Sequence, residues 1–152
     1  MDMAQTSIVE YWAYYSNLTN GLLEHLSSED LSFRPYESMK TLGEELRHIA
    51  DAREIYLRAM VNKRGPSWRE KRMDPEMAVN LDKLKAYYRD LENGYKMFTS
   101  SQIEWERTVI WEEMNDPDIE KCFNWLVHFE CTHQGILSVY LNGLHIDYDI
   151  SS

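Results

Sequence analysis

Apolar residues recur along four segments of the chain at the three-and-four spacing of helices. The segments run from Gln5 to Leu26, from Thr41 to Asn62, from Asp74 to Phe98 and from Asp116 to Gly143. This spacing gives each helix one apolar stripe, and four such helices without a convincing sheet bury their stripes by packing together. The sequence therefore predicts an all-α fold, an up-down four-helix bundle formed by a single domain over residues 1–152.

The starts of three helices carry recognisable capping signals. Thr41 is followed three residues later by Glu44, which is the pattern of a capping box. Asp74-Pro75 and Asp116-Pro117 each combine a capping side chain with a proline suited to the first helical position. The segment from Ser100 to Asn115 alternates weakly, so we predict a connection there and assign no strand.

Composition and charge narrow the class of protein. A hydrophobic fraction of 43% with five Trp and ten Tyr is typical of a globular chain. The net charge of -10 argues against a nucleic-acid partner, and the basic segment from Lys63 to Arg72 is predicted to be a solvated loop. No apolar run approaches the roughly 20 residues of a membrane span, and the N-terminus lacks the pattern of a secretory signal. We therefore predict a cytoplasmic protein with no membrane partner.

Residues 125–141, WLVHFECTHQGILSVYL, place several polar groups in an apolar helix. On a wheel of about 100° per residue, His133 falls among Leu126, Leu137 and Tyr140, and Glu130 lies about 60° away. His128 points elsewhere, because five residues give about 140° of rotation. A buried carboxylate is costly without a partner, so Glu130 is expected to pair with a cation or with His133.

The second helix shows a similar histidine. Its predicted polar face holds Arg47, Asp51, Glu54 and Arg58, and the opposite face holds His48, Ala52, Ile55 and Ala59. One histidine on an apolar face is usually a satisfied core residue. Two of them on different helices, one with a glutamate three residues away, indicate a candidate metal site.

A di-iron site is a further hypothesis, besides a single metal ion and a metal-free bundle. Glu45 to His48 and Glu130 to His133 both read Glu-x-x-His, the motif that carboxylate-bridged di-iron bundles use on two helices. Such a site also needs one inward glutamate on each remaining helix, and Glu10 and Glu92 are the candidates. Short matches of this kind arise easily in an acidic chain.

The sequence resembles the DinB/YfiT-like family of small bacterial four-helix bundles. The resemblance covers most of the chain and is carried by LSFRPYESMKTLGEELRHIADAREIYL at residues 31–57 and by LVHFECTHQGIL at residues 126–137. The family shows Arg-Pro before its second helix, a His inside that helix, and HE-x-x-H-x-G in its fourth helix. The resemblance implies that three histidines hold a divalent ion, commonly nickel or zinc, with other positions open to water or substrate.

Carried to this sequence, the resemblance makes His48 and His133 metal ligands and matches the family glutamate to Glu130. The middle ligand position, four residues before His133, holds Phe129, and His128 stands one position early. Glu130 would then be a third ligand or a catalytic base. The resemblance extends to metal-dependent thiol S-transferases and a thiol-dependent isomerase, and it implies a homodimer. We therefore predict a metal-dependent enzyme of the thiol S-transferase or hydrolase type, with a low-molecular-weight thiol as substrate.

Two functions from different classes remain open on the sequence. The first is a metal-dependent transferase or hydrolase with His48, His133 and Glu130 at its centre and with Trp125 and Phe129 in the pocket wall. The second is a metal-free bundle that binds a small molecule or forms a dimeric interaction module. In that protein Phe129 closes the site, and Glu130 pairs with a histidine.

Overall fold

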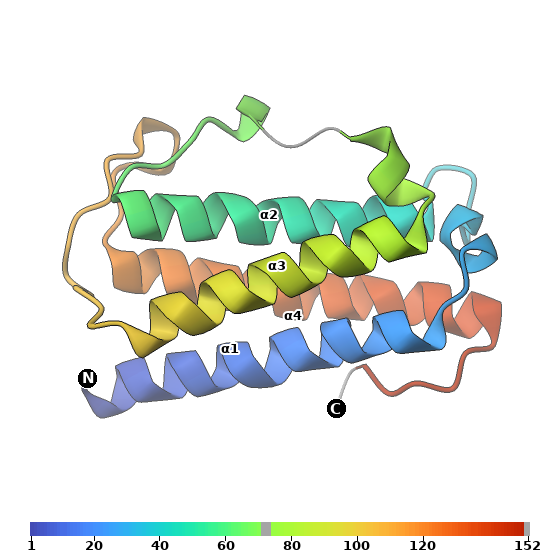
Figure 1. Cartoon of the computed structure of the whole chain (residues 1–152), viewed down its shortest axis with the longest axis horizontal. Coiled ribbons are helices and arrows are strands. Elements are labelled where there is room, and N and C mark those ends of the chain that lie inside the picture. Colours follow the sequence, from blue (N-terminus) through green and yellow to red (C-terminus); the bar gives the residue numbers. More distant parts are fainter. Residues whose placement is uncertain (71–73, 151–152) are drawn as a thin grey trace.

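The computed structural model describes residues 1–70 and 74–150 and confirms the all-α four-helix bundle (Figure 1). The long helices are α1 (Met3–Leu22), α2 (Leu42–Asn62), α3 (Leu81–Ser100) and α4 (Ile119–Leu144). Short 3-10 turns lie between them at Leu23–His25, Glu29–Ser32, Trp68–Glu70, Pro75–Ala78 and Glu112–Met114. The first helix was predicted to reach Leu26, but α1 ends at Leu22 and the turn at Leu23–His25 follows it.

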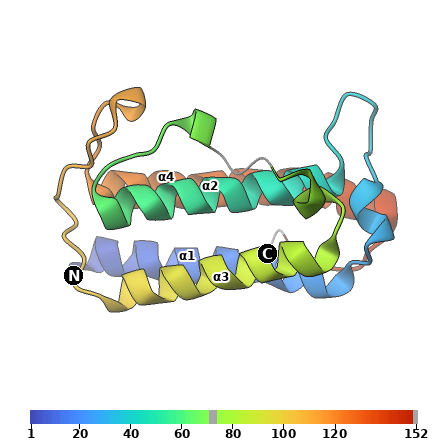
Figure 2. The same cartoon turned by 45° about the horizontal axis from the view of Figure 1, so that its top comes forward.

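The helices form two layers. Figure 2 shows α2 and α4 side by side in one layer and α1 and α3 in the other. α1 and α4 run in one direction, and α2 and α3 run in the other (Figure 1). The long connection between α2 and α3 returns along the bundle before α3 begins, which makes these two helices parallel.

Side-chain caps determine where the helices start. The Thr41 hydroxyl accepts a hydrogen bond from the Glu44 N–H at 3.1 Å, so the predicted start of α2 is confirmed. α2 ends at Asn62 as predicted, and Lys63 after it adopts a left-handed conformation with φ of 55°.

The two Asp-Pro pairs were predicted to start the third and fourth helices, and both predictions were wrong. Asp74 caps only the short turn at Pro75–Ala78, because the Val79 N–H bonds back to Glu76 and closes that turn. Asn80 then caps α3, which begins at Leu81. Asp116 has φ of 45° and accepts a hydrogen bond from the Trp111 N–H, so α4 begins only after its own cap, Asp118.

The core consists of two apolar halves with polar side chains between them. One half gathers around Leu46, Leu84 and Leu137, and the other around Ile55, Phe123 and Leu126. Buried polar residues lie along α1, α2 and α4 between the members of the two halves: Ser16, Thr19, Arg53, Glu130 and Gln134. The bundle therefore has a polar layer in its centre.

The connection before α4 contains no named strand among the described residues. Two isolated bridges, Arg64 to Ile110 and Thr108 to Asp118, are its only extended pairings in the part of the chain described. Arg64 and Arg69 of the basic segment are exposed, and residues 71 and 72 of that segment lie outside the described residues. Among residues 1–70 and 74–150, none of the helices has the length and apolar character that crossing a bilayer requires.

Candidate functional site

His48 from α2 and His133 from α4 lie next to each other, and the ring of Phe129 contacts both. The two imidazole centroids are 5.0 Å apart. Phe129 stacks on His133 with centroids 4.0 Å apart and lies 5.4 Å from His48. All three side chains are half-buried. The sequence prediction that these histidines come together from two helices matches this geometry, and Phe129 is part of the same cluster.

Glu45 holds one nitrogen of His133. Its carboxylate is hydrogen-bonded to Nδ1 of His133, and Glu45 is buried with 3% of its surface exposed. A carboxylate on Nδ1 fixes the orientation of an imidazole and leaves Nε2 for another partner. The sequence had identified Glu45 only as part of a Glu-x-x-His motif, because its partner lies 88 residues away.

Glu130 is fully buried, as the helical wheel predicted, and its partner is Arg53 of α2. Arg53 Nε donates to Oε1 of Glu130 at 2.9 Å, and Nη2 donates to Oε2 at 2.7 Å, which makes a bidentate pair. The Thr19 hydroxyl also donates to Oε2 at 2.5 Å, and Gln134 donates to Thr19 at 2.9 Å. The carboxylate is thereby satisfied on both oxygens.

Arg53 is as buried as its partner, with 1% of its surface exposed. Its guanidinium lies 5.2 Å from the Trp12 ring and 4.9 Å from the Tyr88 ring, and Nη1 donates to the Asn20 amide at 2.8 Å. Burial acts to lower the pKa of Arg53, but the adjacent Glu130 carboxylate acts against it, and the net pKa is raised. Arg53 therefore stays positively charged beside the carboxylate of Glu130.

Sequence reasoning missed Arg53, although its position in α2 carried a signal. Arg53 follows Leu46 by seven residues and Ile49 by four, so it lies on the most buried stripe of that helix. Asp51 was assigned to the polar face and is instead buried, because the Tyr87 hydroxyl reaches it at 3.0 Å. His128 is exposed, as the wheel predicted.

The carboxylates of the di-iron hypothesis are separated. Glu10 is exposed, and Glu92 forms an ion pair with Lys96 on the same helix at 3.1 Å. Glu45 and Glu130 have the partners given above. Among residues 1–70 and 74–150, no three His, Cys, Asp or Glu side chains come together as a group that could hold a metal ion.

The donor set does not fit a divalent centre with three protein ligands. The phenyl ring of Phe129 offers no donor, and Nδ1 of His133 is engaged by Glu45. Glu130 would have to leave Arg53 to reach an ion. The ligand set of His48, His133 and Glu130 therefore stays a prediction that requires a rearrangement of the polar layer.

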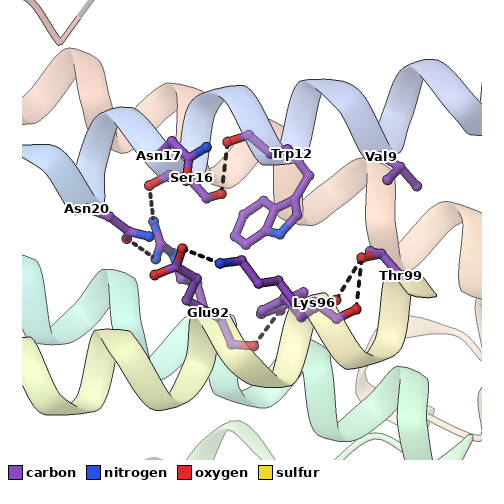
Figure 3. Close-up of a pocket in the computed structure, with 11 residues that line it drawn as sticks. Val9, Trp12, Ser16, Asn17, Asn20, Glu92, Lys96 and Thr99 are labelled. Atoms are coloured by element: carbon purple, nitrogen blue, oxygen red, sulfur yellow. Dashed lines mark hydrogen bonds and ion pairs between the residues drawn. The ribbon is translucent and has the colours of Figure 1, made fainter. Parts of the chain in front are cut away.

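A pocket opens between α1 and α3, in the layer opposite the one that carries His48 and His133 (Figure 3). Its cavity volume is about 100 Å³, and it combines an apolar wall with a polar end. The residues lining it are Val9, Trp12, Ala13, Ser16, Asn17, Asn20, Arg53, Glu92, Tyr95, Lys96 and Thr99. Arg53 thus takes part both in the pair with Glu130 and in the lining of this pocket.

Comparison with protein families matches residues 15–137 to the DinB superfamily. Among solved structures, a DinB-like protein from Bacillus subtilis, YjoA, superposes with a TM-score of 0.77 at 17% sequence identity. The match covers 96% of this chain and 98% of that one, so the two proteins share a fold over nearly their whole length. No curated protein matches the sequence.

Proposed function

This chain belongs to the DinB superfamily, and from that premise we propose that it is a small-molecule-binding member that works without a three-histidine metal centre. The observation that carries the proposal is the position of Phe129. Its ring stacks on His133 and contacts His48, and it stands in the sequence where the family resemblance expects the middle ligand. The cluster is then an aromatic and hydrogen-bonded contact that joins α2 to α4.

The polar layer supports the same proposal. Arg53 places a permanent positive charge beside Glu130, so the acidic group that a metal would have neutralised is already paired. A divalent ion at Glu130 would have to displace the guanidinium and leave it buried without an anion, which is costly. The pair thus takes the place of a metal in balancing the charge of Glu130.

The pocket between α1 and α3 supports binding of a small molecule. Ligand sites are concave, mostly apolar and furnished with a few polar groups that fix orientation. This pocket has Trp12 and Tyr95 in its wall and Asn20 and Arg53 at its polar end. No catalytic step is needed to explain that arrangement.

Metal content tests the proposal. Untagged protein that has never been exposed to a nickel column is analysed by mass spectrometry, before and after incubation with excess zinc or nickel. The double variant His48→Ala/His133→Ala and the single variant His128→Ala are analysed in the same way. We expect no stoichiometric metal in any sample and no thermal shift with either ion. His128 is the matched control, because it is an exposed histidine on the same helix as His133.

Metal in the wild type and in His128→Ala, absent from the double variant, would overturn the proposal and favour the second candidate. That candidate is a metal-dependent thiol S-transferase or hydrolase with His48, His133 and Glu130 as its site. The observation that favours it is the carboxylate of Glu45 on His133, since metal-binding histidines usually donate their second N–H to a carboxylate. Thiol-transfer assays would then follow.

The oligomeric state is a separate prediction. The resemblance implies a homodimer, and α1 presents the exposed aromatic rings of Tyr11 and Tyr14 as candidates for an interface. Light scattering at several protein concentrations measures the mass directly. A mass of one chain, 18.1 kDa, at all concentrations would contradict the dimer and leave the binding proposal untouched.

A further inference from the structure

We infer that the pocket between α1 and α3 binds a small neutral molecule that carries a carbonyl group on a compact apolar body. The inference deepens the proposed function and rests on it, because it names the site and the ligand class. Figure 3 shows the pocket with Trp12 and Ser16 on the α1 side and Glu92 and Lys96 on the α3 side. Helices from both sides therefore supply the contacts.

Aromatic and small apolar groups form the wall. The rings of Trp12 and Tyr95 lie with centroids 4.6 Å apart, and both residues are more than nine-tenths buried. The Tyr95 hydroxyl is committed to the Arg53 carbonyl at 2.6 Å, so that ring offers the pocket a surface without a free hydroxyl. Val9 and Ala13 extend the wall along α1. This part of the pocket suits a compact hydrocarbon body.

Hydrogen-bond donors gather at the other end. Four of the five N–H groups of Arg53 donate to Glu130, Ser16 and Asn20. The fifth, on Nη1, has no hydrogen-bond partner among the described residues. Asn20 accepts from Nη1 through Oδ1, which leaves its NH₂ group to donate. A carbonyl oxygen placed here would accept from the guanidinium and from the amide.

The charges around the pocket favour a neutral ligand. The charge of Arg53 is balanced by Glu130 at 2.7 Å, and that of Lys96 by Glu92 at 3.1 Å. A carboxylate ligand would bring a third negative group against these pairs, and an ammonium ligand would meet the N–H groups of a buried cation. A carbonyl oxygen satisfies the remaining N–H without adding charge.

The cavity volume limits the size of the ligand. The cavity is about 100 Å³, somewhat smaller than the roughly 150 Å³ cavity that holds a benzene ring. By the same ratio, about four non-hydrogen atoms are the upper limit for the enclosed part of the ligand. 2-Pyrrolidinone is a neutral lactam that can place its carbonyl group and the adjoining ring atoms inside the cavity while the rest of its ring stays at the mouth. Pyrrolidine supplies a comparable ring with a positive charge and no carbonyl, and butyrate supplies a carboxylate of similar size.

The experiment is a titration of the full-length ¹⁵N-labelled protein with each probe, followed by the indole N–H signal of Trp12 and the side-chain amide signal of Asn20. The variant Ala13→Leu fills the pocket from its exposed lining position on α1. Ala4→Leu makes the same exchange at an exposed position of α1 that does not line the pocket, and serves as the matched control.

We expect saturable shifts with 2-pyrrolidinone in the wild type and in Ala4→Leu, and loss of these shifts in Ala13→Leu. Shifts of equal size with pyrrolidine or butyrate would overturn the ligand class. No saturable shift of either signal, up to the highest lactam concentration at which the protein stays folded, would overturn the site. The metal measurement is independent of this titration, and a ligand that shifts signals elsewhere would overturn this inference while leaving the proposed function standing.

Discussion

Replacing Arg53 by methionine should destabilise the bundle more than any comparable change on its surface. The substitution keeps a long apolar side chain in place and removes the cation from a carboxylate that is fully buried. Glu130 would keep the Thr19 hydroxyl but lose both hydrogen bonds from the guanidinium. Asn20 would also lose the donor that holds its amide oxygen.

The expected magnitude follows from the burial of the pair. Breaking a buried ion pair by removing one partner costs about 3–5 kcal/mol, because the other charge remains uncompensated. A loss of about 4 kcal/mol is a large part of a total stability of about 5–15 kcal/mol. At about 2–4 °C per kcal/mol for a chain of this length, the melting temperature should fall by roughly 8–16 °C.

The double variant Arg53→Met/Glu130→Leu separates the charge effect from packing. Removing both charges leaves Thr19 and Gln134 hydrogen-bonded to each other, so no buried ion remains. Apolar replacement of both partners of a buried pair is often neutral or stabilising. We therefore expect the double variant to recover most of the stability that the single variant loses.

Guanidinium chloride unfolding followed by circular dichroism at 222 nm measures these differences in free energy. The exposed pair of Glu104 and Arg107 supplies the control, since Glu104→Gln should lie within the error of the measurement. The reasoning is refuted if Arg53→Met is no less stable than this control. It is also refuted if the double variant loses the sum of the two single losses, because the two charges would then be independent.

Further predictions concern glycines, thiols and alkaline pH. Gly43→Ala should destabilise the protein, because its Cβ would lie 1.8 Å from the Ala78 carbonyl oxygen. The same exchange at Gly135 meets no atom within 4 Å and should stabilise α4 by up to about 1 kcal/mol. Thermal unfolding of both variants checks these two expectations. Burial raises the pKa of the Cys122 thiol to about 12, so a thiol reagent at pH 8 should label Cys131 first and Cys122 only after unfolding, as mass spectrometry of timed samples would reveal. Above about pH 9 the unfolded chain loses protons that the folded chain retains on Cys122 and the buried tyrosines, so the free energy of unfolding should fall with rising pH; denaturant titrations from pH 7 to 10.5 that show a constant value would contradict this.

The apolar pattern predicted the four helices because each depends on spacing within one segment of chain. Thr41 was identified as a cap for the same reason, since its hydrogen bond reaches only three residues along the chain. Asp74 gave a false helix start, because Asp-Pro caps a single 3-10 turn as readily as a helix. Local signals therefore locate turns and stripes well and leave the length of each element open.

The partners of the candidate site could not be predicted, because they depend on how helices face one another. The burial of Glu130 was evident from its helix, but its pairing with Arg53 joins residues 77 positions apart. The contact of Glu45 with His133 spans 88 positions. Asp51 was misplaced because the hydroxyl that satisfies it comes from α3. Each pairing requires the relative rotation of two helices, which the wheel of a single helix does not contain.

The polar layer also disfavours incorrect alignments of one helix on another. Helices with leucine-rich stripes can slide past one another by a turn and still bury most of their apolar surface. A slide of one turn, about 5.4 Å, would carry the Arg53 guanidinium beyond hydrogen-bonding reach of Glu130, which it now holds at 2.7 Å. Both charges would then be buried without an ion-pair partner. The free energy of the misaligned bundle would therefore rise steeply relative to that of the native one. The pair of Arg53 and Glu130 therefore selects one alignment of α2 on α4.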